Sequence, residues 1–232
     1  MPDEPQPIHL RPVAALADRV LLPGDPGRAL ALAQVVLGDD RKMFNHHRGL
    51  WGYTGTAADG ALLTIQSTGM GGASAAIVLE ELAALGVRTA VRVGTARAVA
   101  GAVALGDLVA ATAVHGADGV SRALGVPGRR GLDGPLTAHL VAVATRAGLV
   151  VSTDLFYAVD AESDGTAWTE DGALAVDLET APLAAVAARH GVAFGAIVAM
   201  VADAHGQRLD DEAVAAAGEA VGVAGAGALT AG

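Results

Sequence analysis

Short apolar segments alternate with longer segments of helical periodicity along nearly the whole chain, and this alternation is the strongest constraint on its fold. We predict strands over residues 19–24, 61–67, 89–94, 107–114, 174–179 and 195–203. Helices are predicted over residues 26–38, 72–86 and 135–148, after the strand that ends at 179, and from Asp210 onward. Residues 116–134, which are rich in Gly, Arg and Pro, are predicted as a loop.

Strands that are apolar on both faces need helices on both faces of their sheet. The alternation therefore predicts an α/β fold, with a central mixed and largely parallel sheet flanked by helices. The 232 residues can bury one substantial core, and no linker, repeat or low-complexity segment divides them. We expect a single domain over residues 1–232.

Composition narrows the classes of partner. Hydrophobic residues make up 52% of the chain and charged residues 17%, as in folded globular proteins, and the formal net charge is −10. This charge argues against nucleic acid or an anionic membrane as a partner. The absence of cysteine excludes disulfides and thiolate metal sites and fits a cytoplasmic location. We expect no signal peptide in "MPDEPQPIHLRP" and no apolar stretch long enough to span a bilayer.

Polar residues follow the predicted strands at the edge where α/β sheets bind ligands. Arg28 lies one turn into a helix that a glycine turn opens, and Arg92 interrupts an apolar strand. Two arginines, the Thr95 hydroxyl and glycine N–H groups suit a phosphate-sized anion. Carboxylates at the ends of later strands suit sugar hydroxyls and proton transfer. The pattern indicates a site for phosphate, a sugar and an acid; the carboxylates are Asp177, Glu179 and Asp203.

Other motifs have simpler interpretations. "TGMGGAS" differs from a dinucleotide fingerprint because Ser74 replaces the third glycine and no acidic residue follows on the next strand. The seven histidines show no metal-ligand spacing, so no metal site is predicted, and "NHH" at 45–47 is typical of a solvated loop. Arg129 and Arg130 are expected to face solvent. A tight turn with a helix-capping aspartate is an equally simple interpretation of "GDP" alone.

Several segments together resemble one family, namely "LLPGDPGRA", "RGLWGYTGT", "STGMGGASAAIVLEELAALGVRTAVRVGTA", "GDLV", "DLFY", "VDLETAPLAAVAARHG" and "MVADAH". They resemble the nucleoside phosphorylase-I family, in its branch of bacterial hexameric purine nucleoside and uridine phosphorylases. The resemblance runs from about His9 to His205 and is weak from Gly206 onward. It implies a phosphorylase/hydrolase-like fold and an enzyme of the pentosyltransferase class.

The resemblance also implies a role for individual residues. Asp203 would protonate the base as the glycosidic bond breaks. Phosphate would bind to Gly24, Arg28, Arg92 and Thr95 and to Arg48 of a neighbouring subunit. The ribose would contact Met70, Glu179 and His9, the last again from the neighbour. The base would contact Ala96, Arg97, Phe156, Val176 and Leu178.

The implied reaction is phosphorolysis of a nucleoside to free base and ribose 1-phosphate, with inorganic phosphate as co-substrate and no cofactor. Because two contributors come from a neighbour, the resemblance implies a homo-oligomer with sites shared within a dimer, and a hexamer built from dimers. A purine is favoured because Asp203 matches the acid of the purine branch. The uracil-reading Gln and Arg of the uridine branch are missing from "AVDAESDGTAWTEDG", yet "STGMGG" and "GVRTAVRVGT" look closer to that branch.

Two departures from the family pattern bear on the base end of the site. Arg97 stands where the family has glycine, and the last predicted helix lacks the arginine that activates the acid in the purine branch. Arg97 could take over that role or read an unusual base. The departures leave open a diverged member that acts on a modified nucleoside or nucleotide. Arg28, Arg48 and Arg92 argue against a nucleosidase, and Glu179 with Asp203 argues against a non-catalytic binding protein.

Overall fold

The computed structural model describes residues 7–99, 101, 103–157 and 168–231. In this part of the chain one ten-stranded sheet has the order β10-β6-β8-β9-β5-β1-β4-β3-β2, with β7 paired to β6. The strands are β1 (Arg19–Pro23), β2 (Lys42–Asn45), β3 (Gly52–Thr56), β4 (Leu62–Gln66), β5 (Thr89–Ala98), β6 (Leu108–Gly116), β7 (Gly128–Gly131), β8 (Arg146–Ser152), β9 (Ala173–Asp177) and β10 (Ala193–Ala202). The helices are α1 (Pro26–Val36), α2 (Gly72–Ala84), α3 (Gly119–Ala123), α4 (Pro135–Val143), α6 (Thr180–His190) and α7 (Asp211–Thr230), with a 3-10 turn η1 (His47–Gly49).

The sheet is mixed, with a parallel centre. Strands β4, β1, β5 and β10 run parallel to one another, whereas β3 pairs antiparallel with β4 and β6 pairs antiparallel with β10. Direct pairing of β5 with β10 closes a ring through β6, β8 and β9. The predicted α/β fold with a central mixed sheet is therefore confirmed.

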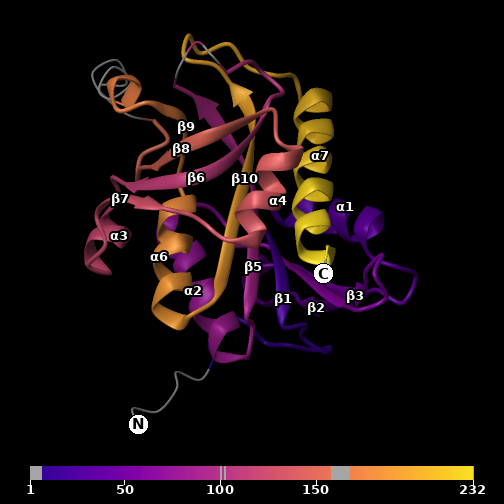
Figure 1. Ribbon diagram of the computed structural model, residues 1–232. Coiled ribbons are helices and arrows are strands. Elements are labelled where there is room, and N and C mark those ends of the chain that lie inside the picture. The colour runs from indigo at the N-terminus through magenta and orange to yellow at the C-terminus, as the bar shows by residue number, and fades with distance from the viewer. Residues whose placement is uncertain (1–6, 100, 102, 158–167, 232) are drawn as a thin grey trace.

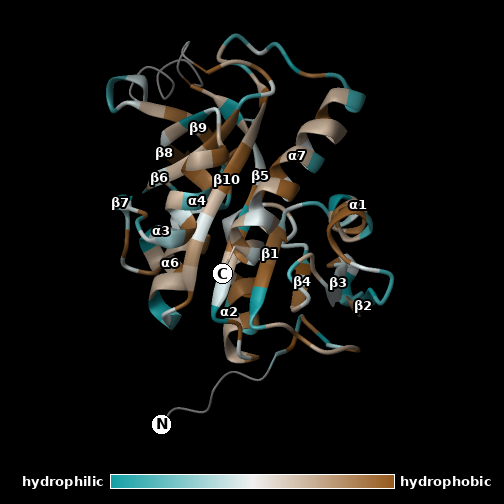
Figure 2. Cartoon of the chain, turned by 45° about the vertical axis from the view of Figure 1, so that its right-hand side comes forward, coloured by the Kyte–Doolittle hydropathy of each residue, from teal (hydrophilic) through white to brown (hydrophobic). Residues whose placement is uncertain are grey.

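Helices cover both faces of the sheet (Figure 1). Helices α1, α4 and α7 pack on one face, and α2, α3 and α6 pack on the other. In Figure 2, β10 and most of β1 are coloured as hydrophobic, as expected for strands covered on both sides. Each face of the sheet has a hydrophobic core, and alternate side chains of β5 pack into one or the other. Val91 and Val93 pack toward α1 and α7, whereas Ala96 and Ala98 pack toward α6.

Some elements differ from the sequence predictions. The helix predicted over 135–148 ends at Val143, and residues 146–152 form β8, which pairs with β6 and β9. Residues 116–134 contain α3 and β7 rather than only loop. The edge hairpin of β2 and β3 was not predicted. These elements are short, and strand pairing rather than local periodicity decides their conformation.

One edge of β5 is shared by two strands, and this sharing creates an opening. β10 pairs along β5 from Thr89 to Arg97. On the other edge, β1 pairs with residues 89–93, and β9 pairs with residues 97 and 98. Among the described strands, none pairs with residues 94–96 on that edge. The backbone of this short segment is consequently free for a ligand.

Helix α7 packs through a stripe of small residues. It contacts β1, β5, β10 and α1. A Cβ at Gly225 would lie 2.4 Å from Val93 Cγ1 and 3.0 Å from Leu21 Cδ1, so only glycine lets the helix approach these strands this closely. By length and composition α7 could also cross a membrane, a property that we did not expect from the sequence. Its contacts with the sheet are those of a core helix in a globular protein.

We expect Gly225→Ala to destabilise the fold by about 1–3 kcal/mol, because the added methyl group meets buried, stiff side chains. The matched control is Gly227→Ala on the exposed side of the same helix, where a Cβ has nothing within 4 Å. This control should stabilise the protein by about 0.5–1 kcal/mol, since alanine is the better helix former. Urea unfolding followed by circular dichroism measures both; equal effects of the two substitutions would contradict the packing argument.

Candidate active site

The centre of the candidate site is the buried guanidinium of Arg92, whose side chain is 2% exposed. Its Nε donates to Asp177 Oδ2 and to Thr180 Oγ1, both at 3.0 Å. Its Nη2 donates to Glu179 Oε2 at 2.6 Å and lies 2.9 Å from Asp177 Oδ2. Burial by itself disfavours the charge, but Glu179 and Asp177 outweigh it and raise the pKa of Arg92 above its usual value.

Asp177 orients this arginine. Its carboxylate also accepts hydrogen bonds from Ser152 Oγ at 2.6 Å and from the Thr180 backbone N–H and hydroxyl. The same ion therefore joins the ends of β8 and β9 to the start of α6. The sequence marks Asp177 as a strand-end carboxylate and, by resemblance, as a shortened replacement of a glutamate near the ribose, but not as a partner of Arg92. Its spacing of two from Glu179, which places both on one face of an extended chain, is the available signal.

Arg92 keeps one donor group unused. Its Nη1 is buried and has no hydrogen-bond partner among the described residues. The guanidinium crosses over Gly94, where a Cβ would lie 2.6 Å from Nη2 and 2.8 Å from Cζ. Glycine at position 94 is thus required for this position of the arginine. The two N–H groups on Nη1 remain available to an acceptor that enters the site.

A second unpartnered guanidinium belongs to Arg28. The Asp25 side chain caps α1 by accepting from the Arg28 backbone N–H at 2.6 Å. The Arg28 side chain packs against α7, where a Cβ at Gly218 would lie 2.8 Å from its Nε, and within the described residues it has no acceptor. Burial lowers the pKa of Arg28; Asp25 opposes this shift and the charge of Arg92 adds to it. Two neighbouring guanidiniums that repel each other form a site that an anion stabilises.

The turns after β1 and β4 meet beside these arginines. Gly69 donates its backbone N–H to Gly24 O at 3.0 Å. Next along the chain, Met70 is 89% exposed, and Gly71 donates its N–H to Glu179 Oε1 at 2.7 Å. Glu179 therefore connects Arg92 to the N-terminal end of α2. Several residues that the sequence predicts for the site therefore lie in one cluster. They are Gly24, Arg28, Met70, Arg92, Glu179 and the half-buried Thr95 on β5.

Arg97 and Asp203 lie at the other end of the opening. Arg97 is in register with Val176 on β9 and with Ala202 on β10, and Asp203 follows Ala202 directly. Asp203 Oδ1 accepts the backbone N–H groups of His205 and Gln207, both at 2.8 Å. Its Oδ2 has no partner within the described residues. This second oxygen is therefore free to accept or donate a hydrogen bond.

The remaining residues assigned to the base differ in their surroundings. Phe156 is 62% exposed, and its ring centroid lies 5.9 Å from Arg208 Cζ, which joins the segment after β8 to the loop after β10. Leu178 is half-buried between Asp177 and Glu179. Ala96 is buried within the core between the sheet and α6, so its side chain packs in the interior. Part of the segment in which we found no uracil-reading residues, 158–167, lies outside the described residues.

His9 lies apart from this cluster in the same chain. His9 Nδ1 is 2.7 Å from Glu81 Oε1, and His47 Nδ1 is 3.0 Å from His9 O. Glu81 is ten residues beyond Gly71 along α2, about 15 Å of helix. Arg48 is exposed, makes no ion pair within the described residues and adopts a left-handed backbone with φ 59°. Such strain in a non-glycine residue often marks a functional position.

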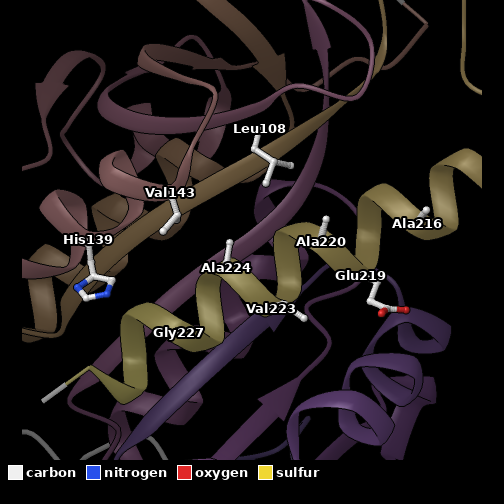
Figure 3. Close-up of a pocket in the computed structure, with 9 residues that line it drawn as sticks. All are labelled: Leu108, His139, Val143, Ala216, Glu219, Ala220, Val223, Ala224 and Gly227. Atoms are coloured by element: carbon white, nitrogen blue, oxygen red, sulfur yellow. The ribbon is translucent and has the colours of Figure 1, made fainter.

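A groove of about 680 Å³ lies elsewhere, between α4, α7 and the start of β6 (Figure 3). Its walls are mainly apolar, and Figure 3 shows His139 and Glu219 at opposite ends of it. It contains none of the predicted site residues. Across residues 7–99, 101, 103–157 and 168–231, no group of three His, Cys, Asp or Glu side chains is arranged to hold a metal ion. The opening along β5 therefore remains the candidate active site.

The fold and the site define an α/β protein with unpartnered cationic donors and paired carboxylates at an opening in a mixed sheet. The family described as the phosphorylase superfamily matches residues 18–231, and the chain belongs to this family. Purine nucleoside phosphorylases of the DeoD type are among its relatives. The Geobacillus sp. (strain WCH70) protein is 35% identical over 189 residues, 76% of this chain and 77% of its own length. The Clostridium beijerinckii protein is 35% identical over 196 residues, which cover 80% of this chain and 81% of its own length.

Solved structures agree on the fold. The uridine phosphorylase of Vibrio fischeri ES114 superposes with a TM-score of 0.83 and covers 92% of each chain, at 23% identity. The family resemblance inferred from the motifs is confirmed. The expectation of an enzyme of the nucleoside phosphorylase type, a pentosyltransferase, is confirmed with it.

The arm that carries His9 is held by a titratable group. Glu81 accepts from the backbone N–H groups of Ile8, His9 and Leu10. Burial acts to raise the pKa of Glu81, but these bonds and the His9 ring outweigh it and lower the pKa below the ordinary 4.5. Since the pKa is lower in the folded chain, the stabilisation is complete above pH 4.5 and is lost as the pH falls through the folded value.

We expect Glu81→Gln to be less stable than the wild type by about 2 kcal/mol at neutral pH, because charge-assisted hydrogen bonds are lost. The difference should shrink as the pH falls below 4.5, where the wild-type carboxylate also becomes neutral. Urea unfolding over a pH series measures it, with Glu219→Gln on the exposed side of α7 as the control. A difference that stays constant with pH would show that Glu81 acts through packing and not through charge.

Proposed function

We propose that this protein catalyses phosphorolysis of a purine nucleoside to free base and ribose 1-phosphate, with inorganic phosphate as co-substrate and no cofactor. The observation that carries the proposal is the pair of unpartnered guanidinium groups of Arg28 and Arg92 Nη1 beside the unpaired backbone of residues 94–96. A buried donor without an acceptor, such as Arg92 Nη1, is costly unless a ligand supplies the acceptor. Phosphate supplies several and carries the opposite charge.

Phosphate binds to Arg28, Arg92, Thr95 and the turn at Gly24. The Thr95 hydroxyl has no hydrogen-bond partner within the described residues, which leaves it free to donate to a phosphate oxygen. Glu179, held by Arg92 and Gly71, accepts from the ribose hydroxyls, and Met70 covers the sugar. A phosphate oxygen then forms a bond to C1′ of the ribose while the bond from C1′ to N9 of the base breaks.

Asp203 acts as the general acid. Its proton passes from Oδ2 to N7 of the base, so that the leaving group departs neutral. Phe156, Val176, Leu178 and Arg97, with the backbone at Ala96, surround the base. A purine is favoured over a pyrimidine because N7, which Asp203 protonates, exists only in purines. The relatives named as purine nucleoside phosphorylases point in the same direction.

A neighbouring subunit completes the site with Arg48 and His9. Arg48 is exposed and has no ion-pair partner within the described residues. Glu81 holds Nδ1 of His9, which leaves Nε2 for the ribose 5′-hydroxyl of the neighbour's substrate. Exposed apolar side chains, among them Ile8, Trp51 and Met43, occur on the same segments and suit an interface. We propose a dimer with shared sites, further assembled into a hexamer, in the cytoplasm and without a nucleic-acid or membrane partner.

The test is release of free base from inosine, guanosine, adenosine and uridine, with and without phosphate. We expect cleavage of purine nucleosides that requires phosphate. Arg28→Met should raise the KM for phosphate by about 10- to 100-fold, because a charge-assisted contact is lost. The matched control, Arg130→Met on the exposed strand β7, should leave this KM unchanged. Cleavage without phosphate would indicate a nucleosidase, and cleavage of uridine alone a pyrimidine enzyme.

We expect subunits that carry Arg28→Met and subunits that carry Arg48→Ala to complement each other. Each variant alone lacks one phosphate contact in every site. A mixed dimer contains one site with its own Arg28 and the neighbour's Arg48, so activity should return after the two variants are dissociated and reassociated together. Native mass spectrometry verifies that mixed dimers have formed. Mixed dimers without recovered activity would contradict the shared site.

A further inference from the structure

Arg97 is a cation that the fold places at the base end of the site without a partner. It is half-buried and makes no hydrogen bond or ion pair within the described residues. Strand pairing on both sides holds its backbone, with Val176 in register on β9 and Ala202 on β10. Its guanidinium nitrogens are not among the buried unpartnered atoms, so they reach solvent and are available to an acceptor on a ligand.

Its nearest titratable neighbour along β10 does not supply the acceptor. Ala202 is the register partner of Arg97 on β10, one strand spacing away, and Asp203 is the next residue after Ala202. No ion pair joins the two side chains, and Asp203 Oδ1 instead accepts two backbone N–H groups of its own loop. Arg208, the other arginine near this end, is already packed over the Phe156 ring. Arg97 is therefore the free cation at the base end among the described residues.

Among the described side chains at this end, the hydrogen-bonding groups without a partner are Arg97 and Asp203 Oδ2, and both would donate to a bound base. A guanidinium has N–H donors and no acceptor, and a protonated carboxyl that serves as an acid also donates. Hypoxanthine and guanine present two acceptors on one edge, O6 and N7, whereas adenine presents N7 and an amino donor at position 6. A 6-oxopurine satisfies both donors of the site. Adenine would set its amino group against one of them and leave that donor unpaired.

We propose that Arg97 makes this enzyme selective for nucleosides of 6-oxopurines, with its guanidinium donating to O6 of the base while Asp203 serves N7. The inference rests on the proposed phosphorolysis of purine nucleosides and adds the class of base. The long side chain recognises the base through the hydrogen bonds that its guanidinium donates.

The experiment compares kcat/KM for inosine, guanosine and adenosine at saturating phosphate in the wild type, Arg97→Gly and Arg97→Lys. We expect the wild type to prefer inosine and guanosine over adenosine by about 10- to 100-fold. Arg97→Gly should reduce this preference at least tenfold and leave the KM for phosphate unchanged. Arg97→Lys keeps a cation that only donates and should retain most of the preference. Arg130→Gly on β7 is the matched control and should leave it unaltered.

The outcomes separate this inference from the proposed function. Phosphorolysis of purines with equal use of adenosine, or with a preference that Arg97→Gly does not alter, overturns the role of Arg97 alone. Absence of phosphate-dependent cleavage of any nucleoside overturns the proposed function. Calorimetric binding of free hypoxanthine and adenine then decides the inference independently: tighter binding of hypoxanthine that disappears in Arg97→Gly supports it, and equal binding of the two bases overturns it.

Discussion

The buried contact of Arg92 with Asp177 and Glu179 is the interaction on which the rest of the site depends. The arginine extends from β5, Asp177 ends β9, and Glu179 also accepts from the N–H of Gly71 at the start of α2. Removing one partner would leave a buried charge uncompensated, at a cost of several kcal/mol. The three charges must therefore fold together, and in doing so they set the distance between the proposed phosphate and sugar positions.

The same interaction leaves donor groups for the anion that we propose to bind here. Asp177 and Glu179 use the Nε and Nη2 donors of Arg92, and Nη1 is left over. Arg28, pressed against α7 at Gly218, adds a second cation without a carboxylate partner. Glycines at 94 and 218 provide the room for the two guanidiniums. These two glycines thus determine where the charged side chains can lie, in addition to allowing close packing.

Much of the fold could be predicted from local pattern. The strands at β1, β4, β5, β6, β9 and β10 and the helices α1, α2, α6 and α7 lie where periodicity and glycine turns indicate. The strand β8 could not be predicted, because "RAGLVVS" follows an apolar helix without a break and becomes a strand only through its pairing with β6 and β9. The hairpin of β2 and β3 is likewise formed by pairing with β4 at the sheet edge.

The sequence by itself determined which side chains the proposed site uses. Gly24, Arg28, Arg92, Glu179 and Asp203 follow strands and helix starts that local pattern predicts. Only the tertiary structure decided how they are used. It assigned Asp177 to orient Arg92, held His9 at Glu81 away from the cluster, and left Arg97 without a partner within the described residues. The physical reason is that charge pairing depends on which strands become neighbours. Strands β1 and β9 pair with the same edge of β5, and neither pairs with residues 94–96 between them. This arrangement results from the packing of the whole sheet.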